Sequence, residues 1–168
     1  MTAVDSTVDI SDSFIVYNGT AIGQQSVIGG VALAPNTPGS RFERNTVAFN
    51  QSKSGRFRGG VSCDGAMVVA RGNIVYHNME FDGAGGIKND ATTQNDGDCQ
   101  FGNSLLLAAD PGNLGFAAPI SMPYDFHLTG ASPSTVVDAA GACNGIDFDG
   151  DVRPINAACD LGADEFHP

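Results

Sequence analysis

Asn73-Ile-Val-Tyr-His-Asn78 repeats the pattern of Asn45-Thr-Val-Ala-Phe-Asn50, which lies 28 residues earlier in the chain. Two further segments align with this pair: Ser13-Phe-Ile-Val-Tyr-Asn18, 32 residues before Asn45, and Asn103-Ser-Leu-Leu-Leu107, 30 residues after Asn73. A Gly-Gly pair and an aliphatic residue accompany the first three segments, at Gly29-Gly30-Val31, Gly59-Gly60-Val61 and Gly85-Gly86-Ile87. Because two aligned features recur together, they define a repeat of about 30 residues.

The repeat predicts stacked coils of short strands. A single short strand cannot bury its apolar face, whereas stacked copies form shared columns. Period-two alternation predicts two inward columns on one face, namely Ile15, Val47, Val75, Leu105 and Tyr17, Phe49, His77, Leu107. Asparagines at the turns predict hydrogen-bonded ladders along the stack, formed by Asn45, Asn73, Asn103 and by Asn18, Asn50, Asn78. The predicted fold is an all-β, right-handed, single-stranded parallel β-helix of about four coils with a C-terminal disulfide-stapled cap.

Residues from about 9 to 107 resemble the pectate-lyase-like right-handed β-helix superfamily. Three C-terminal stretches are similar to the tail of secreted bacterial choice-of-anchor or polymorphic-outer-membrane-like β-helix proteins: Asp125-Phe-His-Leu-Thr-Gly-Ala-Ser132-Pro133, Asp147-Phe-Asp-Gly-Asp-Val-Arg153-Pro154 and Cys159-Asp160-Leu-Gly162. The resemblance implies that the tail closes the end of the helix. It implies no catalytic set for this chain.

The break in the repeat predicts two parts of one domain, with coils over residues 1–107 and a cap over residues 108–168. An open β-helix end exposes unpaired strand edges, so we expect the cap to cover that end. Within the cap, Arg153 is expected to pair with a carboxylate such as that of Asp160. The N-terminal coil is expected to be the weak end, which would pair with another copy of the chain or with upstream coils of a longer protein.

The composition excludes several classes of protein. The chain has 168 residues, with 19 acidic and 8 basic ones, and its formal net charge is −11. This charge argues against nucleic acid as a partner, because phosphate neutralisation needs excess Lys and Arg. No apolar run reaches the roughly 18 residues of a membrane-spanning helix. The 16 aspartates, 12 asparagines and 22 glycines favour turns over helices.

The cysteines predict an oxidising compartment, and hence an extracellular or cell-surface protein. Cys143 and Cys159 bracket a loop rich in Gly and Asp and are expected to form a disulfide. Cys63 and Cys99 either pair or remain buried thiols. Since Met1-Thr-Ala-Val-Asp5 does not have the pattern of a secretion signal, we expect a processed chain or a piece of a longer secreted protein.

Six of the eight basic residues lie between positions 41 and 71 and suggest a local positive zone. An enzyme acting on an acidic glycan would use basic residues for proton abstraction and charge neutralisation. The candidates are Arg44, Arg58 and Arg71, with Asp64 or Asp82 nearby. No lyase or hydrolase motif accompanies them, so we assign no catalytic residue and favour a solvated turn surface.

Asp147, Asp149 and Asp151 alternate in a pattern that can gather oxygens around calcium. The EF-hand pattern fails, because Gly150 stands at the fourth position and Ala158 at the twelfth. We therefore favour a turn-shaping role and predict no required cofactor, with calcium as the alternative.

The sequence thus favours a non-catalytic extracellular module that acts as a rigid scaffold or as an adhesin-like segment contacting carbohydrate or a cell surface. The alternative is a polysaccharide lyase or glycoside hydrolase that acts through the Arg-rich coils. An ice-binding surface would need an outward ladder of threonines, and the predicted outward column of Phe14, Thr46, Ile74 and Ser104 is not one.

Overall fold

The computed structural model of the chain describes residues 2–4, 7–19, 28–34, 39–52, 59–63, 68–81, 87–88, 99–107 and 114–168. These residues form strands, turns and extended chain and contain no helix. The predicted all-β class is therefore confirmed.

Three parallel sheets, here named A, B and C, contain most of the strands. In hydrogen-bonding order, sheet A consists of β1 (Thr2–Val4), β4 (Val31–Ala34) and β8 (Val61–Cys63). Sheet B consists of β13 (Phe101–Gly102), β9 (Val68–Arg71), β5 (Ser40–Glu43) and β2 (Asp9–Ser11). Sheet C consists of β14 (Leu105–Leu107), β10 (Ile74–Tyr76), β6 (Thr46–Ala48) and β3 (Phe14–Val16).

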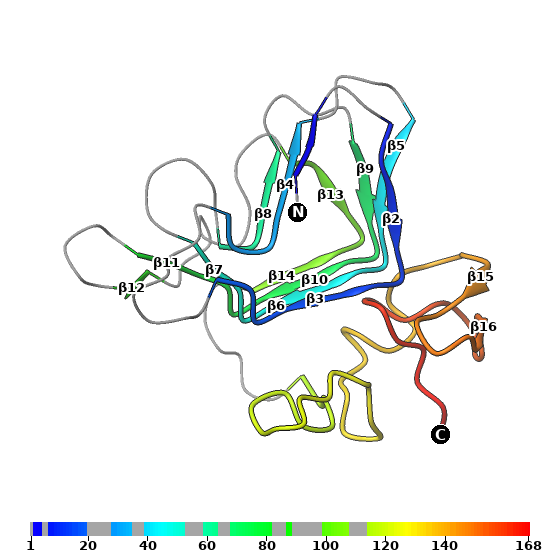
Figure 1. Cartoon of the computed structure of the whole chain (residues 1–168). Coiled ribbons are helices and arrows are strands. Elements are labelled where there is room, and N and C mark those ends of the chain that lie inside the picture. The colour runs from blue at the N-terminus through cyan, green and yellow to red at the C-terminus, as the bar shows by residue number, and fades with distance from the viewer. Residues whose placement is uncertain are drawn as a thin grey trace.

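Two smaller sheets complete the described structure. In one, β11 (Met79–Phe81) pairs in parallel with β7 (Gln51–Ser52) and antiparallel with β12 (Ile87–Lys88). In the other, β15 (Gly145–Ile146) pairs antiparallel with β16 (Val152–Arg153). Figure 1 shows sheets A, B and C around a common interior, with the C-terminal segment outside sheet C.

The inward column predicted in sheet C is present, with one change at its end. Val47 pairs in register with Ile15 on one side and Val75 on the other, and all three pack in the interior cluster with Val31, Leu33 and Phe42. The fourth member is Leu106, which pairs with Val75, and not Leu105 as predicted. The predicted alignment of the fourth repeat was therefore wrong by one residue.

The second inward column was also predicted wrongly. Tyr17, Phe49 and His77 follow their strands with φ values of 55°, 55° and 50°. A left-handed residue ends the alternation of a strand, so these side chains do not share the face of Ile15 and its partners. Tyr17 and Phe49 pack instead in a second apolar cluster, on the outer side of sheet C.

Asparagine side chains connect each coil to the one before it at two corners. At the first corner, Asn73 Oδ1 accepts the backbone N–H of Asn45 at 2.9 Å, and Asn45 Oδ1 accepts that of Ser13 at 3.2 Å. At the second corner, Asn78 Oδ1 accepts from Asn50 and Asn50 Oδ1 accepts from Asn18, both at 3.0 Å. The predicted ladders are therefore present in both corners.

Asn103 does not belong to its predicted ladder. The backbone N–H of Asn73 donates to Ser104 Oγ at 3.1 Å, so Ser104 takes the ladder position of the fourth coil. Asn103 is exposed and has a φ of 44°, in the corner position that Arg44 and Gly72 occupy in earlier coils with φ values of 52° and 68°.

Glycine is required where successive coils approach most closely. A Cβ on Gly29 would lie 2.3 Å from the carbonyl oxygen of Gly59, and one on Gly59 would lie 2.2 Å from that of Met79. Side chains cannot be accommodated against backbone at these distances, which explains why glycine recurs at this point of the repeat. The third pair, Gly85-Gly86, lies outside the described residues.

The C-terminal segment, residues 114–168, covers the outer face of sheet C and does not close the end of the stack as predicted. Phe116, Phe126 and Val136 pack in one buried cluster with Ile74 and Tyr76 of β10. The reason is that sheet C carries apolar residues on both faces, and such a sheet must be covered on both sides. The outward residues Thr46 and Ile74, which the sequence analysis placed in an outward column, are accordingly buried.

Asn73→Ala is expected to lower the free energy of unfolding by about 2–5 kcal/mol, because it leaves several buried backbone groups without partners. Asn73 Oδ1 accepts from Asn45, and its Nδ2 donates to the carbonyl oxygens of Phe42 and Arg71. Denaturant melts of the two proteins measure the difference. Asn103→Gly is the matched control, because glycine keeps the left-handed φ of this corner, and it should change stability by less than about 0.5 kcal/mol. An equal loss in both variants would contradict the observed register.

Candidate functional site

A polar cleft of about 470 Å³ lies between sheet B and the loop of residues 140–144. Arg41, Glu43 and Arg44 come from the end of β5, and Arg71 comes from the end of β9. Cys143 belongs to the opposite wall, which its disulfide to Cys159 ties to the rest of the C-terminal segment. The cleft thus brings three arginine side chains together.

Each arginine of the cleft is paired with a carboxylate of its own or the preceding coil. Arg44 forms two hydrogen bonds with Asp12, at 2.8 and 2.9 Å, and lies 3.4 Å from Glu43. Arg71 Nε lies 3.1 Å from Glu43 Oε1, and Arg41 pairs with Asp9. These pairs connect adjacent coils across sheet B.

The carboxylate partners of Arg41 and Arg44 favour the charged form of these two side chains. The hydrogen bond to Asp12 is the main cause that raises the pKa of Arg44 above its ordinary value, against the opposing effect of burial. The hydrogen bond to Asp9 likewise raises the pKa of Arg41. A group with a raised arginine pKa is a poor proton acceptor at neutral pH, so neither side chain is suited to act as a general base.

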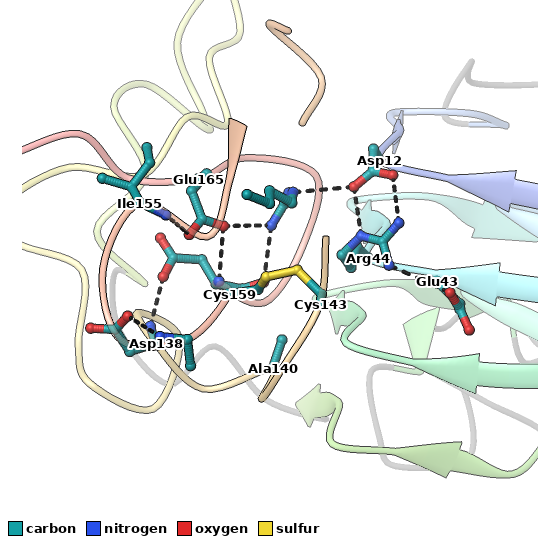
Figure 2. The surroundings of a disulfide bond; sticks show 12 residues. Asp12, Glu43, Arg44, Asp138, Ala140, Cys143, Ile155, Cys159 and Glu165 are labelled. Atoms are coloured by element: carbon teal, nitrogen blue, oxygen red, sulfur yellow. Dashed lines mark hydrogen bonds and ion pairs between the residues drawn. A yellow bond between two sulfur atoms is a disulfide. The ribbon is translucent and has the colours of Figure 1, made fainter. Parts of the chain in front are cut away.

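Arg153 is fully buried and joins the C-terminal segment to the first coil through an ion pair with Asp12. Figure 2 shows Asp12 on one side of this contact and Glu165 on the other. Arg153 Nη1 donates to Glu165 Oε2 at 2.8 Å and to the backbone carbonyl of Asp160 at 3.2 Å, and its Nη2 donates to the carbonyl of Gly162 at 2.9 Å. Its Nε lies 3.2 Å from Asp12 Oδ1, which makes an ion pair without hydrogen-bond geometry.

The predicted pairing of Arg153 with a carboxylate is confirmed, but the partner is not Asp160, the acid suggested by the sequence. The Asp160 carboxylate accepts the backbone N–H groups of Asp138 at 2.6 Å and Phe166 at 2.7 Å, and the acid that pairs with Arg153 is Glu165. Burial raises the pKa of both Asp160 and Glu165, although backbone N–H donors and Arg153 oppose the effect.

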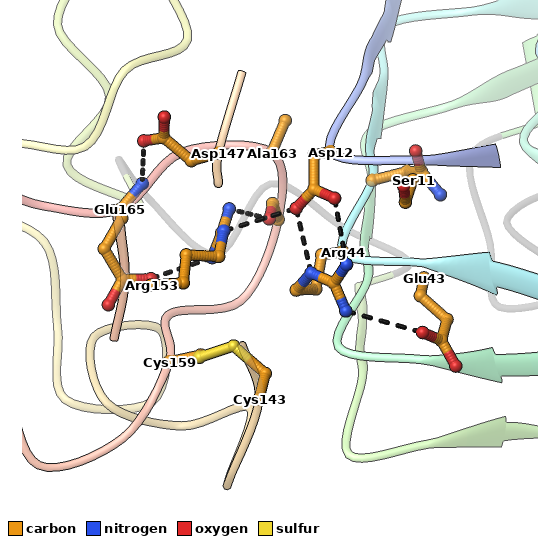
Figure 3. Close-up of polar contacts among 12 residues, drawn as sticks. Ser11, Asp12, Glu43, Arg44, Cys143, Asp147, Arg153, Cys159, Ala163 and Glu165 are labelled. Carbon is orange, nitrogen blue, oxygen red and sulfur yellow. Dashed lines mark hydrogen bonds and ion pairs between the residues drawn. A yellow bond between two sulfur atoms is a disulfide. The ribbon is translucent and has the colours of Figure 1, made fainter. Parts of the chain in front are cut away.

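Asp12 makes one charge network of these contacts, because it pairs with both Arg44 and Arg153 (Figure 3). Arg44 approaches Glu43, and Glu43 in turn approaches Arg71 on the third coil. The network therefore runs from the C-terminal segment along the wall of the cleft.

Both disulfides are present. Cys143 and Cys159 are joined with a Cα–Cα distance of 6.0 Å, as predicted. Cys63 and Cys99, for which the sequence left two states open, are also joined, with a Cα–Cα distance of 5.1 Å. The second bond connects β8 to the chain just before β13.

The three aspartates proposed as calcium ligands do not converge. Asp147 Oδ1 accepts the N–H groups of Asp149 and Asp151, at 2.9 and 2.8 Å, and its Oδ2 accepts that of Glu165 at 3.0 Å. Asp149 and Asp151 instead pair with histidines, at 2.8 Å from His127 and 3.0 Å from His167. Because Asp147 is engaged by backbone donors, the predicted set fits a turn better than a calcium ion.

His127 lies among three carboxylates in the part of the chain that the structure describes. Its Nδ1 is 2.5 Å from Asp125 Oδ1, and ligand atoms of His127, Asp149 and Asp164 lie within 4.8 Å of one another. Burial lowers the pKa of His127, but the hydrogen bond to Asp125 and the charges of Asp164, Asp149 and Asp125 outweigh it and raise that pKa. Calcium prefers oxygen ligands, so this group does not support the alternative of a calcium site.

The structure brings together only part of the proposed catalytic set. Arg44 and Arg71 share the cleft, whereas Arg58, Asp64 and Asp82 lie outside the described residues. Sequence reasoning missed the acids that pair with the arginines. The signal was present, since Asp9 and Asp12 precede Arg41 and Arg44 by the same 32 residues that separate the first two repeats.

No protein-family model, curated protein or solved structure matches this chain. The predicted membership of the pectate-lyase-like superfamily therefore stays a prediction.

The melting temperature is expected to rise as the pH is lowered from 8 to 5. The folded pKa of His127 is raised, so its contribution to stability is fully present below its unfolded pKa of about 6.5 and is lost as the pH rises through the folded value. Asp160, Asp164 and Glu165 act in the same direction, because burial raises their pKa values. Thermal melts of the protein and of His127→Gln at pH 5, 6, 7 and 8 measure this; an unchanged slope above pH 6 in the variant would contradict the role of His127.

Proposed function

We propose that this chain is a non-catalytic extracellular module, built as a right-handed, single-stranded parallel β-helix of about four coils with a disulfide-stapled C-terminal segment. It acts as a rigid scaffold, or as an adhesin-like segment that contacts carbohydrate or a cell surface. On this proposal it belongs to the pectate-lyase-like superfamily and is similar to the C-terminal part of a secreted bacterial β-helix protein.

The observation that carries the proposal is that the arginines of the cleft are engaged in ion pairs. Arg41, Arg44 and Arg71 each pair with a carboxylate, and two of these pairs connect the first coil to the second. A lyase needs a base that is free to take a proton, whereas these three side chains are engaged by carboxylates. Their arrangement supports a structural role, in which ion pairs and asparagine ladders hold neighbouring coils in register.

One observation supports an extracellular location. The two disulfides are typical of oxidising compartments. In the described part of the chain, no helix has the length and apolar character needed to cross a membrane.

The cleft supports the alternative of a polysaccharide lyase or glycoside hydrolase acting on an acidic glycan. The side chain of Arg71 is 61% exposed and uses only its Nε in the pair with Glu43. Arginine binds carboxylates through two parallel N–H groups, so the outer edge of Arg71 could hold a uronate. This chemistry equally serves binding without cleavage, which the proposed module allows.

Incubation of the purified protein with pectate, alginate and glycosaminoglycans tests the proposal. We expect no new unsaturated or reducing ends, because the described arginines are held in ion pairs. The matched variants are Arg71→Ala, on an exposed side chain, and Val69→Ala, on the same strand. Cleavage that Arg71→Ala abolishes and Val69→Ala retains would establish the enzyme in place of the module.

A further inference from the structure

The two ends of the coil stack are uncovered in the part of the chain that the structure describes. In the inward column of sheet C, Val47 and Val75 are 0% exposed, whereas Ile15 at one end is half-buried and Leu106 at the other is 39% exposed. The strands that carry the two end residues, β3 and β14, each have one hydrogen-bonded neighbour in sheet C. The C-terminal segment leaves these ends open, because it lies against the side of the sheet.

The backbone groups at the two ends are complementary. Thr46 N–H donates to the carbonyl of Ser13, Leu105 N–H to that of Asn73, and Tyr17 N–H to that of Ala48. Backbone groups alternate in direction along a parallel strand. This alternation turns the N–H and C=O groups of Phe14 and Val16 outward at the N-terminal end, and those of Leu106 outward at the C-terminal end.

The hydrogen-bonded ladder at the first corner can also be extended by a further coil. Ser104 Oγ donates to the carbonyl of Gly102 and accepts the N–H of Asn73 from the preceding coil. Ser13 Oγ repeats the first contact, donating to the carbonyl of Ser11 at 2.7 Å. The hydroxyl of Ser13 therefore has the same orientation as that of Ser104, and its oxygen keeps a lone pair that can accept the backbone N–H of a coil placed before the first one.

The end strands lack the residues that usually prevent edge pairing. Lysine, proline or an inward charge commonly protects an exposed strand edge. None of these occurs in β2, β3, β13 or β14, and the single charged residue of these strands, Asp9, is paired with Arg41. Beside β3 the chain forms a hollow of about 370 Å³ lined by Ile10, Phe14 and Ile15, whereas Leu106 is exposed at the opposite end.

We propose that a second copy of this chain docks head to tail, with its Leu105–Leu107 pairing in register against Phe14–Val16 and its Leu106 entering the hollow beside Ile15. This contact is heterologous, so repeated docking extends a fibre of stacked coils. The association adds to the proposed scaffold role and is independent of what the module binds.

Sedimentation velocity over a concentration series tests the proposal. The unmodified protein should gain mass with concentration. Val16→Pro removes an N–H that has no partner among the described residues of one copy, and it should weaken association about tenfold or more. Val16→Ala keeps that N–H and should associate. Leu106→Glu should also weaken association, and Val69→Glu is its control, because Val69 is similarly exposed at 41% but lies on the outer face of sheet B. Circular dichroism confirms folding, and Ile15→Lys replaces Val16→Pro if that variant does not fold.

A mixing experiment establishes the orientation. Head-to-tail docking predicts that Val16→Pro and Leu106→Glu are each monomeric alone and form a one-to-one dimer when mixed, since each retains one intact end. A dimer of Leu106→Glu alone would show head-to-head contact and overturn the proposal. A monomeric unmodified protein at its highest soluble concentration would overturn it as well, and would leave the proposed function standing.

Discussion

The hydrogen bond from a backbone N–H to the asparagine oxygen of the next coil is the constraint on which the coil stack depends. A corner in a parallel stack exposes backbone groups that the strand ladders cannot reach, and burial makes an unpaired group costly. Asn73 and Asn78 satisfy those groups from within the stack, and both are fully buried. Since each side chain bonds to the coil before it, the period of the repeat is fixed by these contacts as well as by the apolar columns.

A second constraint acts sideways, through the C-terminal segment. Repeats in a solenoid usually contact only their neighbours, so cooperativity passes from coil to coil. Here one segment reaches several coils: Arg153 meets Asp12 of the first coil, Ala163 N–H donates to Thr46 of the second, and Gly162 N–H donates to the carbonyl of Gly72 of the third. A buried ion pair is expensive unless its geometry is good, which explains the hydrogen bonds around Arg153.

The sequence predicted the stack because its determinants recur, but it did not predict where non-recurring parts lie. Asn103 invited an alignment that was wrong by one residue, because an asparagine also suits the left-handed corner that Gly72 occupies one coil earlier. The position of the C-terminal segment was harder to foresee, although β10 offered a signal: Ile74, Val75 and Tyr76 are all apolar, as expected of a strand buried on both faces. The cleft is formed by sheet B together with the loop of residues 140–144, so neither the repeat alone nor the C-terminal segment alone could predict it.

The position of the C-terminal segment against the side of sheet C determines which surfaces of the stack remain exposed. A segment placed over one end would have ended the stack, whereas this one consumes the outer face of sheet C and leaves both β3 and β14 as edges. The same placement forms the cleft, since the Cys143 loop stands against sheet B only because the segment passes along the side. The position of the C-terminal segment on the side of the stack therefore allows two features at once. One is a polar cleft with a defined wall, and the other is a stack that can be lengthened by further coils of the same register. A segment that covered one end would have blocked the second.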